Sequence, residues 1–408
     1  MSINKLSPIK SLERYIILDA LRGFALLGIC MANLPEFALY TFLKSEVTTA
    51  MPTATIDSVL RFLLYVFVDG KFYTIFSVLF GIGFSIIIAN AAKKGKDGFR
   101  VFYRRMFILL LIGFVHLIFI WSGDILMLYA LLGMLLPCFQ NASDKKLLLW
   151  AGCLIFLPVV LDFICEVTNI YPASSIVRLQ EYYCAKYGIT NDNFAYWLRD
   201  ATDYKEVFHF LIQGALVRIQ EFVDGNRYFK VMGLFLVGFY VGRKRVYANI
   251  KGQEQWLKLF FRYGTIIGLP LSILYAWSAM SQHHLGLTVH SLLYFASVYT
   301  LSFAYMSGLC LLHIHRENLS VWNYIAAPGR MALSNYIGQS IIGVLLFYGI
   351  GLGWGANIGL VYIEIIVFVI YVSQILYSRI WLSKFRFGLL EWGWRILTYG
   401  KWFKLRNV

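Results

Sequence analysis

Long apolar stretches alternate with short polar or basic segments along most of this chain. A membrane-spanning helix needs about 20 mostly apolar residues, and ten stretches reach or approach that length. They are Ile16–Tyr40, Phe72–Ala91, Met106–Trp121, Ile125–Phe139, Leu147–Cys165, Tyr228–Val241, Phe260–Met280, Ser291–His313, Met331–Ile350 and Ile358–Tyr377. The pattern predicts an all-α polytopic membrane helix bundle with about ten transmembrane helices.

The apolar run from Met106 to Phe139 is too long for a single crossing at about 1.5 Å per residue. We therefore expect a helical hairpin there. The tripeptide Ser122-Gly123-Asp124 supplies the turn, because serine and aspartate favour helix N-caps and glycine favours turns. Asp124 is then expected to open the second helix of the hairpin.

Two segments are more polar than the spans. The insert at residues 166–226 contains Val207–Val223, which alternates apolar and polar residues at helical spacing and is expected to lie on the membrane surface. The tail at residues 378–408 mixes basic residues with tryptophans and predicts interfacial amphipathic helices. Nothing resembles a linker or repeat, so residues 1–408 are expected to form a single polytopic domain.

Composition supports a protein embedded in the lipid bilayer, with 59% hydrophobic and 14% charged residues. Soluble globular domains average about 25% charged residues. The net charge of +15 does not indicate a nucleic-acid partner. The basic residues gather at the ends of apolar spans rather than along one polar face.

Basic segments also predict the topology, because cytoplasmic loops are rich in lysine and arginine. Three such segments contain Lys93, Lys94, Lys96, Arg100, Arg104 and Arg105; Arg243, Lys244, Arg245, Lys251, Lys258 and Arg262; and Arg379, Lys384, Arg386, Arg395, Lys401, Lys404 and Arg406. The basic N-terminus with Lys5, Lys10 and Arg14 leads into an apolar helix and is typical of a signal anchor. We predict a multi-pass protein of the cell inner membrane, with both termini cytoplasmic and the insert outside.

The six cysteines show no spacing typical of a metal site, so no metal is expected. Cys165 and Cys184 are both expected outside, and the sequence leaves open whether they pair.

His116 and Asp124 are the most informative polar residues, because ionisable side chains inside an apolar span are costly and usually functional. The predicted topology places them toward the outer leaflet. It places Asn33, Asp69 and Lys71 at the same depth, with Asn33 roughly 21 Å beyond Asp19 along the first helix. We expect these five residues to form an outer catalytic layer.

A second polar layer is predicted at the inner boundary. Arginine is suited to bidentate contacts with phosphate, so this layer is a candidate site for a phosphorylated cytoplasmic ligand. Its members are Asp19, Arg22, Arg330, Ser334, Asn335 and Tyr336, and Gln339 is a further candidate for binding the same ligand. Glu391 and Arg395 are expected nearby, and Gln339 and Glu364 are expected between the two layers.

Structural interpretations of the same residues stay open. Asp19 and Arg22 have the spacing of an ion pair at a helix start. Asp69 and Lys71 suit a surface pair, Asp124 suits a helix N-cap, and His116 suits a hydrogen bond to a neighbouring helix.

Several motifs resemble the YeiB-like family of bacterial membrane proteins. They include LDALRGFALLGICMAN (Leu18–Asn33), DGKFYTIFSVLFGIGF (Asp69–Phe84), RRMFILLLIGFVHLIFIWSGDILMLYALLG (Arg104–Gly133), PGRMALSNYIGQS (Pro328–Ser340) and FGLLEWGWRILTY (Phe387–Tyr399). That family is similar to the transmembrane acyltransferases, which include heparan-α-glucosaminide N-acetyltransferase and the acyltransferase-three group. Those enzymes move an acyl group from cytoplasmic acyl-CoA to an acceptor across the membrane.

The resemblance implies that Asn33, at the end of the first-helix motif, supports a catalytic site. In the heparan enzyme a catalytic histidine follows soon after that asparagine, whereas no histidine lies between Asn33 and His116 here. Either His116 substitutes from another helix or the chemistry differs.

The leading hypothesis is transfer of an acyl group from acetyl-CoA to an outward-facing glycan, lipid head group or amine. His116 would act as a general base or carry the acyl group, and Asp124 would orient it. Asn33 and Lys71 are candidates to stabilise an oxyanion, with Asp69 beside them. Arg22 and Arg330 would hold the CoA phosphates, and the related enzymes suggest a homodimer.

A transporter is the alternative, because ionisable residues at separate depths also suit a proton or solute path. The sequence has no obvious inverted repeat to support it.

Overall fold

The computed structural model describes residues 15–93 and 98–407. Its regular elements over these ranges are helices, with one isolated bridge between Phe385 and Arg406. The α-helices are α1 (Ile16–Phe37), α2 (Ser45–Ala50), α3 (Ala54–Phe67), α4 (Lys71–Ala92), α5 (Phe99–Phe119), α6 (Leu126–Gly133), α7 (Asp144–Thr168), α8 (Ser174–Tyr187), α9 (Trp197–Asp200), α10 (Tyr204–Asp224), α11 (Arg227–Arg243), α12 (Glu254–Met280), α13 (Leu287–His315), α14 (Val321–Arg330), α15 (Ala332–Phe347), α16 (Leu360–Lys384) and α17 (Leu389–Tyr399). Short 3-10 turns are η2 (Tyr40–Phe42), η3 (Leu136–Phe139), η4 (Val246–Ala248) and η5 (Lys251–Gln253). The predicted all-α fold is confirmed.

Seven stretches of the described chain are long and apolar enough to cross a membrane. They are α1, the joined α3–α4 stretch, α5, α7, the α12 stretch, α13 and α16. The remaining three predicted spans correspond to shorter helices, namely α6, α11 and α15. The total of ten crossings therefore stays a prediction.

One predicted span differs from the structure, and one helix was not predicted. Ile125–Phe139 is not one helix, because α6 ends at Gly133 and a 3-10 turn containing Pro137 follows. Before the expected Phe72–Ala91 span, α3 adds a further helix, and the two helices meet at Gly70, whose φ of 75° suits glycine. Hydropathy marks both regions as apolar but does not locate the end of α6 or the helix α3.

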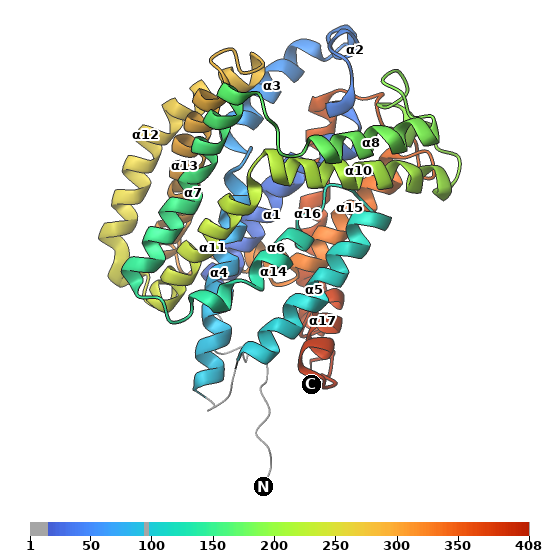
Figure 1. Cartoon of the computed structure of the whole chain (residues 1–408). Helices are drawn as coiled ribbons and strands as arrows, with labels where there is room; N and C mark the ends of the chain where they lie inside the picture. The colour runs from blue at the N-terminus through green and yellow to red at the C-terminus, as the bar shows by residue number, and fades with distance from the viewer. Residues whose placement is uncertain (1–14, 94–97, 408) are drawn as a thin grey trace.

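The helices form a bundle around α1, which packs against α4, α14, α15 and α16 (Figure 1). On one side α12 and α13 pair along their length, with α7 against α13. On another side α5 pairs with α6 and also contacts α17. Helices α8 and α10 lie side by side across the bundle and form most of the insert (Figure 1). The predicted surface segment Val207–Val223 is thus part of α10, which also packs on α5.

The basic segments gather at one end of the bundle. The end of α4, the start of α5, the end of α11 and α17 all lie at the bottom of Figure 1. This grouping is what the positive-inside rule requires, and the cytoplasmic assignment of that end stays a prediction. Of the predicted basic residues, Lys5, Lys10, Arg14, Lys94 and Lys96 lie outside the described residues.

Glycines allow two pairs of helix backbones to touch. A Cβ on Gly81 of α4 would lie 2.0 Å from the Phe235 carbonyl oxygen of α11, and one on Gly238 would lie 2.0 Å from the Val78 carbonyl oxygen. A Cβ on Gly23 of α1 would likewise lie 1.8 Å from the Ile325 carbonyl oxygen of α14. Small residues permit such close packing where no hydrophobic effect drives helices together.

This packing predicts opposite outcomes for two neighbouring glycines. Gly81→Ala places a methyl group against the α11 backbone, whereas Gly83 has no neighbouring atom within 4 Å of an added Cβ. We expect Gly81→Ala to destabilise the protein by about 1–3 kcal/mol, the usual effect of overpacking, and Gly83→Ala to have little effect. Thermal melting of the detergent-purified variants measures both. Equal melting temperatures for the two variants would contradict the close contact.

Candidate functional site

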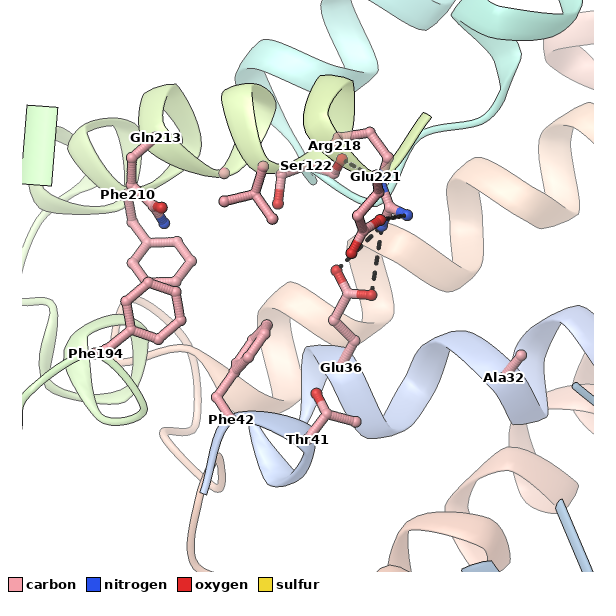
Figure 2. A pocket seen from close by; sticks show the side chains of 12 residues that line it. Ala32, Glu36, Thr41, Phe42, Ser122, Phe194, Phe210, Gln213, Arg218 and Glu221 are labelled. Atoms are coloured by element: carbon pink, nitrogen blue, oxygen red, sulfur yellow. Dashed lines mark hydrogen bonds and ion pairs between the residues drawn. The ribbon is translucent and has the colours of Figure 1, made fainter. Parts of the chain in front are cut away.

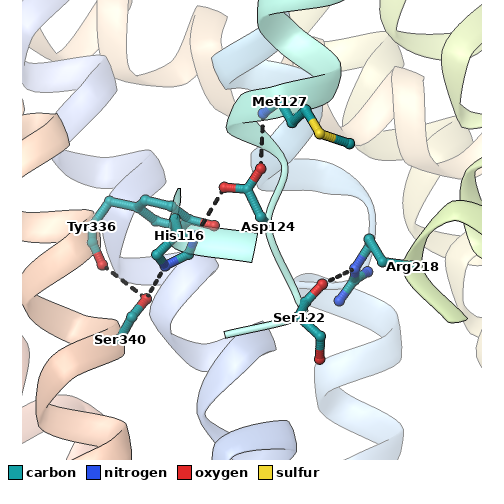
Figure 3. Close-up of polar contacts among 7 residues, drawn as sticks. All are labelled: His116, Ser122, Asp124, Met127, Arg218, Tyr336 and Ser340. Carbon is teal, nitrogen blue, oxygen red and sulfur yellow. Dashed lines mark hydrogen bonds and ion pairs between the residues drawn. The ribbon is translucent and has the colours of Figure 1, made fainter. Parts of the chain in front are cut away.

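His116 lies in a line of three hydrogen-bonded side chains from three different segments (Figure 3). Its Nδ1 is 2.9 Å from Oδ1 of Asp124, and its Nε2 is 2.9 Å from Oγ of Ser340. All three residues are about 1% exposed. The structure thus brings together the histidine and aspartate singled out by sequence and adds a serine from α15.

The local fold explains how Asp124 reaches the imidazole. Helix α5 ends as the backbone amides of Ile120 and Trp121 both donate to the His116 carbonyl oxygen. The chain then turns, and Asp124 Oδ2 accepts from the Met127 amide in the first turn of α6. A Cβ on Gly113 would lie 2.5 Å from that amide nitrogen, so glycine permits the tight α5–α6 approach. Asp124 therefore serves both as a helix cap and as the partner of His116.

The hydrogen bonds also set the tautomer of a neutral His116. A carboxylate can only accept, so the proton of the imidazole lies on Nδ1, facing Asp124. Nε2 is then free to accept the hydroxyl proton of Ser340. The same order of groups, hydroxyl to imidazole to carboxylate, activates serine for nucleophilic attack on acyl groups.

Aromatic rings enclose the imidazole. The centroid of the Tyr336 ring is 5.3 Å from that of His116, and the Trp121 ring is 6.1 Å away in an edge-on arrangement. Trp121 in turn stacks on Phe37 of α1 at 4.3 Å. Tyr336, expected at the inner boundary, therefore contacts the His116 site instead.

An arginine from the insert anchors the turn between α5 and α6. Arg218 of α10 donates from Nε to the Ser122 carbonyl oxygen at 3.0 Å. Its two terminal nitrogens form ion pairs with Glu221 at 2.5 Å and with Glu36 of α1 at 3.4 Å. Arg218 thus ties α10, α1 and the turn together, as Figure 2 also shows. The sequence analysis missed it, because an arginine in a polar insert carries no signal of burial.

A cavity of about 220 Å³ opens beside this arginine (Figure 2). It lies between the end of α1, α10 and the loop before α9, and Ser122 forms part of its wall. Ala32 and Glu36 of α1 also contribute to the lining, so Asn33 lies at the same end of that helix.

Asp69 and Lys71 form a separate polar group at the α3–α4 junction. Lys71 is fully buried and donates to the Tyr65 carbonyl oxygen at 2.7 Å. Tyr275 of α12 donates to Asp69, and its ring lies 5.3 Å from the Lys71 ammonium. Neither residue contacts His116 within the described chain. The position of a residue along its helix predicts its depth but not which neighbouring helix it contacts.

Among the inner candidates, Arg22 pairs within α1 and Ser334 bonds to α17. Arg22 pairs with Asp19 at 2.9 Å, so the ion pair at the helix start does form. Ser334 donates to Glu391 of α17 at 2.6 Å. Arg330 closes α14.

Side-chain amides connect α15 to α16. Asn335 donates to Ser378 at 3.0 Å, and Gln339 donates to Gln374 at 2.9 Å. Gln374 also donates to the Asn335 carbonyl oxygen at 2.9 Å. These bonds give Asn335 and Gln339 a role in helix packing.

Arg105 lies near members of the polar layer predicted at the inner boundary, and it was not predicted as a site residue. It stacks on Trp394 of α17 at 3.6 Å, and Arg22, Arg395 and Glu391 all lie within electrostatic range of it. Arg105 precedes His116 by about three helical turns, so both project from the same face of α5, roughly 16 Å apart.

One chemical class of ligand follows from these donors. The inner arginines suit phosphate. No group of three or more His, Cys, Asp or Glu side chains gathers as a metal site in residues 15–93 and 98–407. Cys165 and Cys184 are free thiols.

Comparisons with known proteins agree with the sequence motifs. Residues 241–401 match the family model "Protein of unknown function (DUF418)". The chain is 28% identical to "Uncharacterized protein YxaH" of Bacillus subtilis (strain 168), over 98% of both chains. It is 27% identical to "Uncharacterized protein YeiB" of Escherichia coli (strain K12), over 95% of this chain and 97% of that one. No solved structure gives a significant match. The predicted YeiB-like resemblance is confirmed.

The position of Arg218 predicts a large effect of its removal. Arg218→Ala leaves the Ser122 carbonyl and two carboxylates without their shared donor, so we expect a loss of about 1.5–3 kcal/mol in stability. Hydrogen–deuterium exchange should rise in α10 and in the turn at residues 120–125. Arg178→Ala, at an exposed site on α8, is the matched control. Unchanged exchange in both segments would show that Arg218 does not anchor the turn.

Proposed function

We propose that this YeiB-like, multi-pass membrane protein transfers an acyl group, with acetyl-CoA as the cytoplasmic donor and an acceptor on the outer side. The buried line from Ser340 through His116 to Asp124 is the observation that carries the proposal. Burying three polar groups is costly unless they are mutually bonded, and an ionisable residue inside a membrane-length helix, as His116 is in α5, usually serves a function.

The geometry supports Ser340 as the nucleophile. As Ser340 Oγ bonds to the thioester carbonyl carbon, its proton passes to Nε2 of His116, and Asp124 stabilises the imidazolium. The carbon–sulfur bond breaks, and the CoA thiolate takes the proton from Nε2. The acceptor then attacks the acyl–serine ester and gives its proton to Nε2, from which it returns to Ser340. The imidazole thus alternates between base and acid.

The inner arginines would hold the CoA phosphates. Arg22 and Arg330 are joined in this role by Arg105 and Arg395, which share the same end of the bundle. Arg105 and His116 are roughly 16 Å apart along α5. The pantetheine arm of the donor would span this distance between the helices and bring the thioester to the His116 site. The Lys71 ammonium donates to the Tyr65 carbonyl oxygen and does not contact His116. Asn33 is therefore the favoured candidate to stabilise the oxyanion.

Transport remains a second candidate because of the group at the α3–α4 junction. A fully buried lysine beside an aspartate within a membrane-length stretch is a typical ion-pathway element. A transporter would move solute in liposomes without acetyl-CoA, whereas an acyltransferase would turn over acetyl-CoA.

Acetyl-CoA binding to the detergent-purified protein tests the donor site. We expect micromolar affinity that Arg22→Ala and Arg330→Ala each weaken by about tenfold or more, since each removes a phosphate contact worth at least about 1.4 kcal/mol. Arg178→Ala, on the insert, should not change the affinity. A well-folded protein that does not bind acetyl-CoA would make transport the first candidate.

Covalent labelling tests the nucleophile. Wild-type protein incubated with radiolabelled acetyl-CoA and then denatured should retain label on the peptide that contains Ser340. Ser340→Ala and His116→Ala should abolish this label and lower turnover by about 10²–10⁴-fold. Ser302→Ala, at another buried serine that bonds only to backbone carbonyl oxygens, is the control. Retained label in Ser340→Ala, for instance as acyl-histidine, would reject Ser340 as the carrier.

A further inference from the structure

The cavity beside Arg218 has two chemically distinct walls (Figure 2). Phe42, Phe194 and Phe210 form one wall, with ring centroids 5.0–6.4 Å apart. Glu36 and Glu221 lie on the opposite wall with Arg218 between them. The Glu221 side chain is 47% exposed, so the cavity meets solvent on that side.

The charged wall favours a cation. Two carboxylates border the cavity beside the Arg218 guanidinium, and Arg227 of α11 is a second cation within electrostatic range of Glu36 and Glu221. Arg218 already uses Nε for Ser122 and its terminal nitrogens for the two glutamates. The Glu36 contacts are long, at 3.4 Å to each oxygen, so this carboxylate retains capacity to accept a further donor. Because both carboxylates border the cavity and the Arg218 nitrogens already bond to protein oxygens, a protonated amine is favoured there over an anion.

A side-chain amide on the cavity wall lacks one partner. Gln213 is fully buried, and its Oε1 accepts from Gln180 at 3.2 Å and also receives the Cys184 thiol. Its Nε2 is buried without a hydrogen-bond partner. An unpaired buried donor costs about 1–3 kcal/mol, so a bound group with an acceptor oxygen would be favoured there.

The size of the cavity limits the ligand. About 220 Å³ is below the roughly 300–1,000 Å³ of sites for drug-sized molecules. A head group with a single small ring or a short chain fits this space, and phenylalanine faces also attract cations.

We infer that this cavity binds a small primary amine that also carries a hydroxyl group. The ammonium would lie against Glu36 and Glu221, a hydroxyl oxygen would accept from Gln213 Nε2, and the apolar part would pack on the phenylalanines. That this amine is the acceptor of the acyl group rests on the proposed function. Its binding does not depend on acyl transfer.

The cavity connects to His116 through the turn between α5 and α6. Ser122 lines the cavity, and Asp124 follows two positions later. Trp121 contacts both sides, since its ring lies 5.9 Å from the Arg218 guanidinium carbon and 6.1 Å from the His116 ring. Trp121 therefore lies close both to Arg218 of the cavity wall and to the imidazole of His116.

Three matched probes test the binding site by calorimetry on the detergent-purified chain. trans-2-Aminocyclohexanol has the amine, the hydroxyl and the apolar ring. Cyclohexylamine lacks the hydroxyl, and trans-1,2-cyclohexanediol lacks the amine. We expect the amino alcohol to bind at least tenfold more tightly than either of the others.

Variants assign each preference to its residue. Glu36→Gln should remove the advantage of the amino alcohol over the diol, and Gln213→Ala should remove its advantage over cyclohexylamine. Glu46→Gln, the same change at an exposed glutamate on α2, should alter neither ratio. Equal affinity of the wild type for all three probes, or no measurable binding, would overturn the inference and leave a solvent-filled cavity.

The two proposals fail separately. Amine binding without any acetyl-CoA turnover would retain the site and reject the acyl-transfer role. Acetyl-CoA turnover with no amine binding would retain the enzyme and reject this acceptor site.

Discussion

A histidine buried among apolar helices has to satisfy both ring nitrogens within the protein, and this requirement organises the centre of the molecule. His116 meets it with a carboxylate from the α5–α6 turn and a hydroxyl from α15. Asp124 is itself fixed because it caps α6, and Arg218 of the insert holds the same turn from outside. Three segments far apart in sequence are thus positioned relative to one imidazole.

Hydropathy predicted the bundle and most of its spans, because an apolar run of membrane length has few other structures open to it. The pairing of His116 with Asp124 also followed from sequence, since a short break between two apolar runs forces a hairpin. Ser340 could not be found in this way. A serine within an apolar helix has no charge to mark it, and its contact depends on how α15 rotates and packs against α5.

Helix rise predicts the depth of a residue but not which helices lie beside it. For this reason the residues predicted as one outer layer do not all lie together. Asp69 and Lys71 were expected beside His116, and they instead meet Tyr275 at a junction whose upper helix, α3, was not expected. Arg105 and His116 are the opposite case. Both lie on α5, so helix rise alone relates the inner layer to the His116 site. The missing information was which helix packs beside which, and that depends on small residues such as Gly81 and Gly238.

The backbone contact between α4 and α11 has a consequence for motion. Helices that touch through side chains can slide or rotate as rotamers change, because side chains form an adjustable layer. No such layer separates α4 from α11 at Gly81 and Gly238, where carbonyl oxygens occupy the space of a methyl group. We therefore expect this pair to move as one unit, so that any conformational change would involve elements outside it, among them α10 with its polar and partly exposed contacts.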